Sequence, residues 1–262
     1  MTTIAAAIRA ALLTADPRAK CFATRDLVRR WRRGALEWRF DVAMPDRPAW
    51  PADLDFRAPS QMPRRGKGGG KARLALWHAL AHIEFVAIDL ALDIVGRFGE
   101  EAGREFADDF LSVAADEAMH FALLQRKLRS LGSCYGALPV HDGLWQAAQD
   151  TAHDVEARLA VVPMVLEARG LDVTPATLER VRAQGDDNGA RILSRILDDE
   201  IAHVGFGTKH FARQAESRGI APNLLWQELV RVNFAGRIQA PFNDSARLAA
   251  GLSRDFYAAI AS

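Results

Sequence analysis

One short motif occurs twice in this chain, and it constrains the fold more than any other feature. The motif is Asp-Glu-x-x-His, at Asp116–His120 and again at Asp199–His203. A lone glutamate precedes the glutamate of each copy by 33 residues, at Glu84 and Glu167. A single Glu-x-x-His arises often by chance, but a repeated unit with equal internal spacing is a strong signal. The chain therefore carries two copies of one unit.

The chemistry of this repeated unit points to metal binding. Glutamate and histidine three residues apart share one face of a helix, and the segments that carry them have helical periodicity. An ionised carboxylate on an apolar stripe is unfavourable unless it is neutralised; for any one glutamate alone, a salt bridge or solvent exposure is the alternative. Two divalent cations would balance four carboxylates, and carboxylate with imidazole suits iron or manganese. We therefore expect a dinuclear metal site with six ligands: Glu84, Glu117, His120, Glu167, Glu200 and His203.

The helices expected around these ligands are long. Helical periodicity predicts four of them, at about 71–98, 101–131, 142–170 and 187–219. Pro163 is expected to kink the third. A short helix over 175–184 is expected next, with Thr174 as its N-cap. Glu167 and Glu200 lie at the same height along two antiparallel helices only if this short helix continues in the direction of the third one. We therefore predict that it does.

The N-terminal part differs in composition from the rest of the chain. Short helices are expected at 3–15 and 23–33, and prolines from Pro45 to Pro63 predict an extended strap. Residues 64–71 are rich in glycine and basic side chains; we interpret them as a linker, with a phosphate or RNA contact or a lid as alternatives. Residues 1–73 hold sixteen lysines and arginines against seven acidic residues. This basic arm either packs on the acidic remainder of the chain or binds a polyanion such as RNA.

The predicted fold is all-α, because no segment alternates polar and apolar residues with a period of two. Its predicted parts are a basic N-terminal arm, a four-helix bundle with the metal site, and C-terminal helices at 222–233 and 244–260; their bounds are 1–71, 72–218 and 219–262. Two cysteines are too few for a disulfide framework, and no apolar run approaches the ~20 residues that span a bilayer. We therefore expect a cytoplasmic protein without a membrane partner.

The amino-acid sequence around the motifs also resembles that of a known superfamily. The stretches "HALAHIEFVAIDLALD", "VPMVLEARGLDVTP" and "DDEIAHVGFGTKHF" resemble an uncharacterised ferritin-like family of bacteria, over about residues 1–215. The pattern is similar to that of ferritin-like di-iron carboxylate proteins and of tRNA-modifying di-iron hydroxylases. The resemblance implies a ferritin-like bundle with two iron ions bridged by Glu117 and Glu200. It also implies that Asp116 and Asp199 each accept a hydrogen bond from the ligating histidine of the opposite motif.

Some features of this chain differ from those of other proteins in the ferritin-like superfamily. The two tyrosines, Tyr135 and Tyr257, lie far from the motifs in sequence, so a radical role like that of ribonucleotide reductase is not expected. The long arm and the C-terminal helices argue against the hollow shell of storage ferritins. Gly205 and Gly207 follow the second motif directly and indicate either close helix packing or room beside the metals for oxygen or a substrate.

Three polar residues outside the ligand set are also candidates for the site. His82 lies two residues from Glu84, on roughly the opposite helix face, and is interpreted with His78 as a core or surface histidine. Glu156 is interpreted as one half of an ion pair.

The predicted site suits two classes of function. The first is a di-iron, or iron–manganese, oxidoreductase: an oxidase or monooxygenase that uses molecular oxygen or peroxide and an electron donor on an organic small molecule. A narrower form of it is a tRNA-modifying hydroxylase. The second class is a metal-handling or peroxide-scavenging protein without an organic substrate, which a closed site would favour. A vestigial site is a third reading, and a homodimer is an open alternative for the assembly.

Overall fold

The computed structural model describes residues 1–62 and 69–262. Within these ranges it contains helices and three isolated β-bridges but no strand, which confirms the all-α class. Contacts divide the chain into two compact units, residues 1–146 and 147–262. The predicted division into arm, bundle and C-terminal helices stays a prediction. Most of the predicted glycine- and lysine-rich loop lies outside the described residues.

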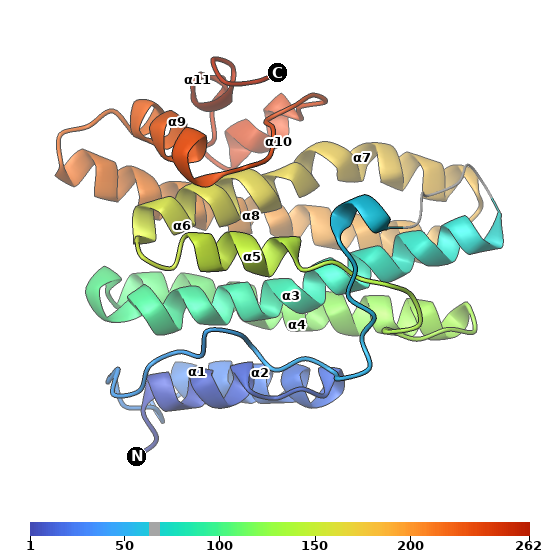
Figure 1. The fold of residues 1–262 in the computed structure, drawn as a ribbon, viewed down its shortest axis with the longest axis horizontal. Helices are drawn as coiled ribbons and strands as arrows, with labels where there is room; N and C mark the ends of the chain where they lie inside the picture. The colour runs from blue at the N-terminus through green and yellow to red at the C-terminus, as the bar shows by residue number, and fades with distance from the viewer. Residues whose placement is uncertain (63–68) are drawn as a thin grey trace. The chain divides into compact units, whose positions relative to one another are not determined.

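The first unit is built on a hairpin of two long helices, α3 (Gly70–Ala102) and α4 (Arg104–Ser130) (Figure 1). Gly103 joins them with φ +91°, in the left-handed region that favours glycine. Both helices agree with the predicted spans to within a turn, except that α3 runs four residues further. Their facing sides bury large apolar side chains, including Trp77, Phe106 and Phe121.

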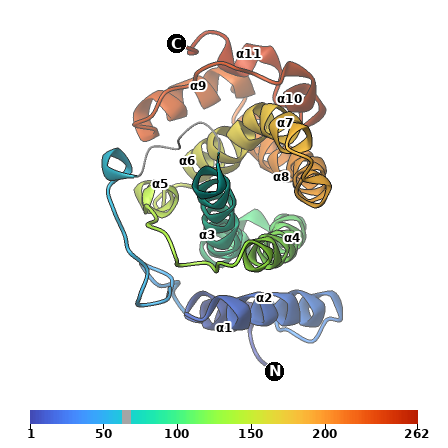
Figure 2. The same ribbon diagram turned by 90° about the vertical axis from the view of Figure 1, so that its right-hand side faces the viewer.

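Two shorter helices pack against this hairpin, α1 (Ile4–Leu12) and α2 (Pro17–Arg32) (Figure 2). The predicted start of the second at residue 23 is wrong. The helix begins six residues earlier because Asp16 caps it, accepting a hydrogen bond from Ala19 N at 2.7 Å, and Pro17 occupies the first turn. Near its other end, Trp31 Nε1 donates to Asp108 on α4 at 2.6 Å.

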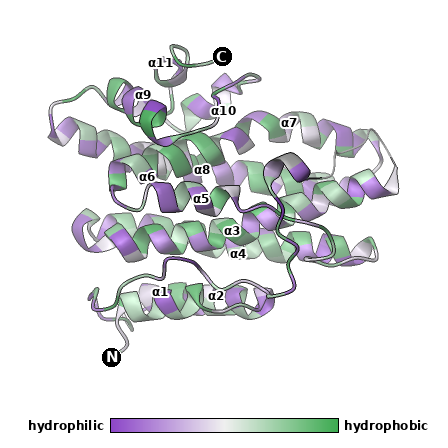
Figure 3. Cartoon of the chain, viewed as in Figure 1, coloured by the Kyte–Doolittle hydropathy of each residue, from purple (hydrophilic) through white to green (hydrophobic). Residues whose placement is uncertain are grey.

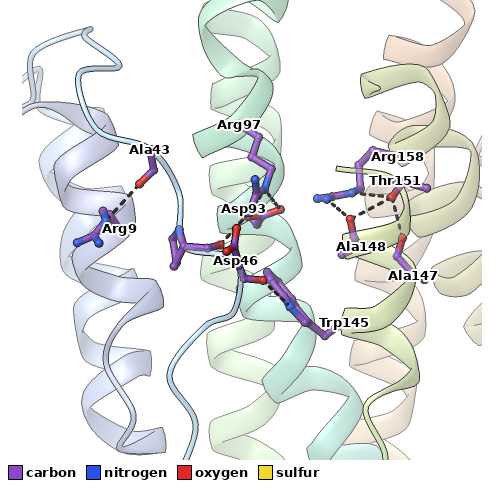
Figure 4. A network of polar contacts seen from close by, with 11 residues as sticks. Arg9, Ala43, Asp46, Asp93, Arg97, Trp145, Ala147, Ala148, Thr151 and Arg158 are labelled. Carbon is purple, nitrogen blue, oxygen red and sulfur yellow. Dashed lines mark hydrogen bonds and ion pairs between the residues drawn. The ribbon is translucent and has the colours of Figure 1, made fainter. Parts of the chain in front are cut away.

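The chain from 34 to 62 is extended, as predicted, apart from the short 3-10 helix η1 (Pro59–Gln61). Side chains of the first unit hold this strap through its backbone: Arg97 Nη2 donates to Pro45 O at 2.8 Å, and Trp145 Nε1 donates to Asp46 O at 3.2 Å. Figure 4 shows the Trp145 bond and the Arg97–Asp93 ion pair.

Basic residues of the N-terminal region pair with acids of their own unit. Lys20 pairs with Asp89 on α3, and Arg47 lies 2.6 Å from Asp142. These pairs support the interpretation in which the arm packs against its own chain. An RNA contact stays a prediction.

The second unit contains one long helical run and a partner helix. The run is α6 (Val155–Val161), η2 (Val162–Glu167) and α7 (Ala168–Ala183), and α8 (Asp187–Ser217) packs along it. The prediction of one helix over 142–170 is wrong at its start. A separate helix, α5 (Gly143–Asp150), occupies the start of that range and ends before α6 begins. Asp154 caps α6 by accepting a hydrogen bond from Glu156 N at 2.8 Å.

Helix α7 passes through Pro175 without a break. The predicted N-cap at Thr174 is therefore wrong, because packing along α8 overrides a local capping signal. The prediction that the 175–184 segment continues in the direction of the preceding helix is confirmed.

The C-terminal helices follow α8. Helix α9 (Pro222–Asn233) has the predicted bounds. The helix predicted over 244–260 is instead two short ones, α10 (Asp244–Ala249) and α11 (Arg254–Tyr257), because Gly251 with φ +75° interrupts it. Polar and apolar residues mix along the long helices (Figure 3). In the described parts of the chain, no helix combines the length and apolarity needed to cross a membrane.

Candidate metal centre

The first unit brings three predicted ligands together, Glu84 from α3 with Glu117 and His120 from α4. We call them the first ligand group. His120 Nδ1 lies 3.3 Å from Glu84 Oε2 and 3.3 Å from Glu117 Oε2. The three side chains each have one ligand atom within 4.8 Å of those of the other two, and all three are buried. The helix spacing therefore brings these three side chains together, and their role as metal ligands stays a prediction.

Electrostatics in the first ligand group favour a bound cation. Burial raises the pKa of Glu84 well above its usual value, and the neighbouring Glu117 carboxylate raises it further. Burial lowers the pKa of His120, but hydrogen bonds and charge from Glu117 and Glu84 outweigh it, so that this pKa rises to about 11. The group therefore retains protons that a cation would displace. Two carboxylates and an imidazole form a donor set that fits a divalent transition metal.

The second ligand group, Glu167, Glu200 and His203, belongs to the second unit. Glu200 and His203 lie on one face of α8, with His203 Nδ1 3.7 Å from Glu200 Oε2, and both are buried. Glu167 is half-buried at the last position of η2, which packs on α8. Because the two groups belong to separate units, their union in one six-ligand site stays a prediction.

A π-helix positions Glu167, and the sequence pattern did not predict it. The segment η2 has π-helical geometry, whose wide turns are frequent at functional sites. Pro163 lies in this segment and is the sequence signal that was interpreted only as a kink. On α8, a Cβ at Gly207 would lie 2.5 Å from Pro163 Cβ, whereas one at Gly205 would meet only ordinary contacts at 3.8 Å. Gly207 therefore permits close packing of α8 on η2.

In each ligand group the lone glutamate, Glu84 or Glu167, is followed five residues later by a buried aspartate, and this wider repeat was not predicted. Asp89 on α3 accepts hydrogen bonds from Lys20 Nζ and, at 2.7 Å, from Trp50 Nε1. Asp172 on α7 binds two nitrogens of the Arg247 guanidinium, at 2.8 and 2.7 Å. Both pairs tie a ligand-bearing helix to a flanking helix of its own unit.

The aspartates of the two motifs are half-buried, whereas the glutamate and the histidine of each motif are buried. Asp199 pairs with Arg195 one turn earlier at 2.6 Å, and Asp116 is half-buried on α4. The hydrogen bonds expected from the histidine of the opposite motif stay predictions. The ion pair expected for Glu156 is confirmed, with Arg218 as its partner.

Tyr135 lies nearer to the first ligand group than its sequence distance suggested. Its ring centroid is 5.1 Å from that of Phe85 and 5.3 Å from that of Phe121, the residues that follow Glu84 and His120. The expectation that both tyrosines are remote from the motifs is therefore wrong in space for Tyr135. Burial raises the pKa of this phenol, so it stays protonated at neutral pH.

These features define an all-helical protein with a buried carboxylate–imidazole cluster that could hold a metal ion. The chain belongs to the family described as "Protein of unknown function (DUF455)", whose model matches residues 13–258. It is 37% identical over 258 residues to an "Uncharacterized protein" of Haemophilus influenzae, covering 94% of this chain and 90% of that relative. No solved structure matches the chain.

Proposed function

We propose that the protein is a non-haem di-iron, or iron–manganese, oxidoreductase. In this proposal the six ligands predicted from the sequence hold two metal ions through four carboxylates and two imidazoles. The observation that carries the proposal is the first ligand group, in which two carboxylates and an imidazole are buried with ligand atoms within 4.8 Å of one another.

Charge balance supports two ions rather than one. Buried carboxylates that lie side by side repel each other and lose hydration, and a cation offsets both costs. The second ligand group repeats the same residue types at the same internal spacing. Two divalent cations would neutralise the four glutamates.

The metal would supply the redox chemistry, since ferrous iron can deliver electrons to molecular oxygen. The residues of the chain would hold the ions and limit the access of water to them. Phe85 and Phe121, with ring centroids 5.1 Å apart, adjoin the ligands of the first group in sequence and are fully buried. They would keep the surroundings of the first group apolar. The organic substrate of this proposal is a small molecule or, in its narrower form, a tRNA.

Metal content and oxygen use together test the proposal. Protein purified from its own source should contain two equivalents of iron, or of iron plus manganese. Glu117→Gln and Glu200→Gln keep the side-chain shape but remove one charge from each group, so each should lose at least one equivalent and the iron-dependent uptake of oxygen. Glu216→Gln is the matched control on the exposed side of α8 and should keep both.

Two results would count against the proposal. Zinc alone, or no metal, in the purified protein would exclude redox chemistry at this site. Ferrous iron that is oxidised while oxygen is reduced to peroxide or water, without oxidation of any added organic compound, would favour metal handling instead.

A further inference from the structure

A cavity of about 200 Å³ lies in the first unit, against helix α3. Its wall on α3 has helical spacing, with Ala75, His78, Ala79 and His82 along one stripe. His82 and Glu84 are two residues apart and therefore lie on roughly opposite faces of the helix. The cavity is thus a separate place from the first ligand group.

The other walls come from two segments far away in the sequence. The strap contributes Pro59 and Met62, and the stretch from Leu138 to His141 faces α3. Ile83, at the edge of the cavity, is 41% exposed, so the cavity has access to solvent.

Hydrogen bonds hold the imidazoles of this cavity in fixed orientations. His82 Nε2 lies 2.9 Å from the carbonyl oxygen of His141, which can only accept, so His82 carries its proton on Nε2. Its Nδ1 then accepts from the Tyr135 hydroxyl at 2.9 Å. His78 Nε2 accepts from the backbone N–H of Gly136 at 3.0 Å. The wall is therefore formed before any ligand arrives, which reduces the ordering cost of binding.

The lining is uncharged and rich in rings. Burial lowers the pKa of His78 to about 4, so it is neutral at pH 7. His82 accepts a hydrogen bond at Nδ1, which only a neutral imidazole can do. No aspartate, glutamate, lysine or arginine is among the described residues that line the cavity. A charged ligand would lose its hydration without a counter-charge. The imidazoles, the proline rings and the Met62 thioether are suited to the faces and edges of a flat ring.

We propose that this cavity binds an uncharged, ring-containing small molecule of about the size of indole. An apolar cavity of about 150 Å³ holds benzene, so a cavity of this volume accommodates one ring with substituents or a fused pair. The site depends on first-unit residues alone and does not require a bound metal.

Indole is the probe for a direct test, and the histidine resonances of wild-type protein are the readout. The chain has seven histidines, of which His78, His82 and His141 line the cavity. With ¹³Cε1-labelled histidine at pH 7, indole should shift these three signals and leave those of His153 and His210 in place. Indole-3-carboxylate, which adds a negatively charged carboxylate to the same ring system, should bind at least tenfold more weakly.

A filled cavity provides the second test. Ala79→Phe should lower the affinity for indole at least tenfold, whereas Ala10→Phe, the same change at an exposed position on α1, should leave it unchanged. Circular dichroism checks the fold of each variant, and the wild-type titration decides the matter if Ala79→Phe fails to fold. The proposal is overturned by indole that shifts none of the three signals up to millimolar concentration, by equal binding of the carboxylate, or by a folded Ala79→Phe protein that binds indole normally.

Discussion

The two ligand groups share a sequence pattern but differ in the backbone that presents them. The first group sits on continuous α-helices, and its histidine lies 3.3 Å from both carboxylates. In the second group, His203 lies 3.7 Å from Glu200, and Glu167 closes a π-helical segment. A π turn contains more residues than an α turn, so it rotates the side chains that follow. Equal spacing in sequence therefore does not give equal local geometry.

The supports behind the two groups differ in a related way. In each group, an aspartate five residues after the lone glutamate forms a buried ion pair with a flanking helix, and we call this pair the support of the group. Asp89 pairs with a lysine, and Asp172 pairs with an arginine. A guanidinium stays charged at all accessible pH values and binds a carboxylate with two parallel bonds. An ammonium group is a single point charge that burial can deprotonate. The first support is therefore the one that should respond to pH.

The largest expected effect comes from breaking these supports. Lys20→Met and Arg247→Met each leave a buried carboxylate without its cation, so each should lower the free energy of unfolding by about 3–5 kcal/mol. Urea denaturation measures both. Arg182→Met removes the exposed partner of Glu179 and is the control, with an expected change of about 0–1 kcal/mol. A cost below about 1 kcal/mol for either buried pair would show that it does not anchor its helix.

The next effect concerns pH and separates the two supports. Burial raises the pKa of Asp89 from 3.8 to about 6, against the opposing influence of Lys20. Since the folded-state pKa lies above the unfolded value, protonated Asp89 favours the fold, and this contribution falls as pH rises from about 4 to 6. The change is up to about 3 kcal/mol. The carboxyl ¹³C signal of Asp89 should titrate with a midpoint near 6; a midpoint near 3.8 would contradict the account.

A smaller effect tests the π-helical side of the comparison. Gly207→Ala places a methyl group where Pro163 already lies and should cost about 1–3 kcal/mol, with partial loss of metal. Gly205→Ala is the matched control two residues away, and it should be neutral or stabilise α8 by up to about 1 kcal/mol. Thermal melting of both variants measures the difference. Equal melting temperatures for the two variants would mean that η2 can move away from α8 without a loss of stability.

The smallest effect is limited to the first unit. Tyr135→Phe removes the hydroxyl that donates to His82 but keeps the ring against Phe85 and Phe121. It should lower the free energy of unfolding by about 0.5–1.5 kcal/mol and leave the metal content unchanged. Urea denaturation and metal analysis of the same sample are the measurements. Loss of metal in this variant would assign the phenol a direct part in the site.

Periodicity alone predicted the long helices α3, α4 and α8 and the placement of each Glu-x-x-His pair on one helix face, because both depend on local geometry. The hairpin of α3 and α4 and the pairing of Glu117 with His120 follow from it. The continuation of the helix beyond Glu167 was also predicted, because Glu167 and Glu200 must lie at the same height along their two helices.

Features that depend on competing signals or distant contacts were not predicted. The capping pattern at Thr174 and Pro175 is a normal helix start, yet packing keeps α7 continuous through it. Tyr135 is 51 residues from Glu84 in sequence, and only the folded chain places its ring against Phe85. The aspartate repeat was visible as a spacing, but its meaning required the cations that come from flanking helices.

Anomalous diffraction at the iron edge, on crystals of protein loaded with ferrous iron, tests the central claim most directly. If both ligand groups serve one dinuclear centre, the map should contain two peaks about 3.5–4 Å apart. One peak should contact His120 and the other His203. A solitary peak beside Glu84, or peaks in each unit too distant to share a bridging carboxylate, would contradict it.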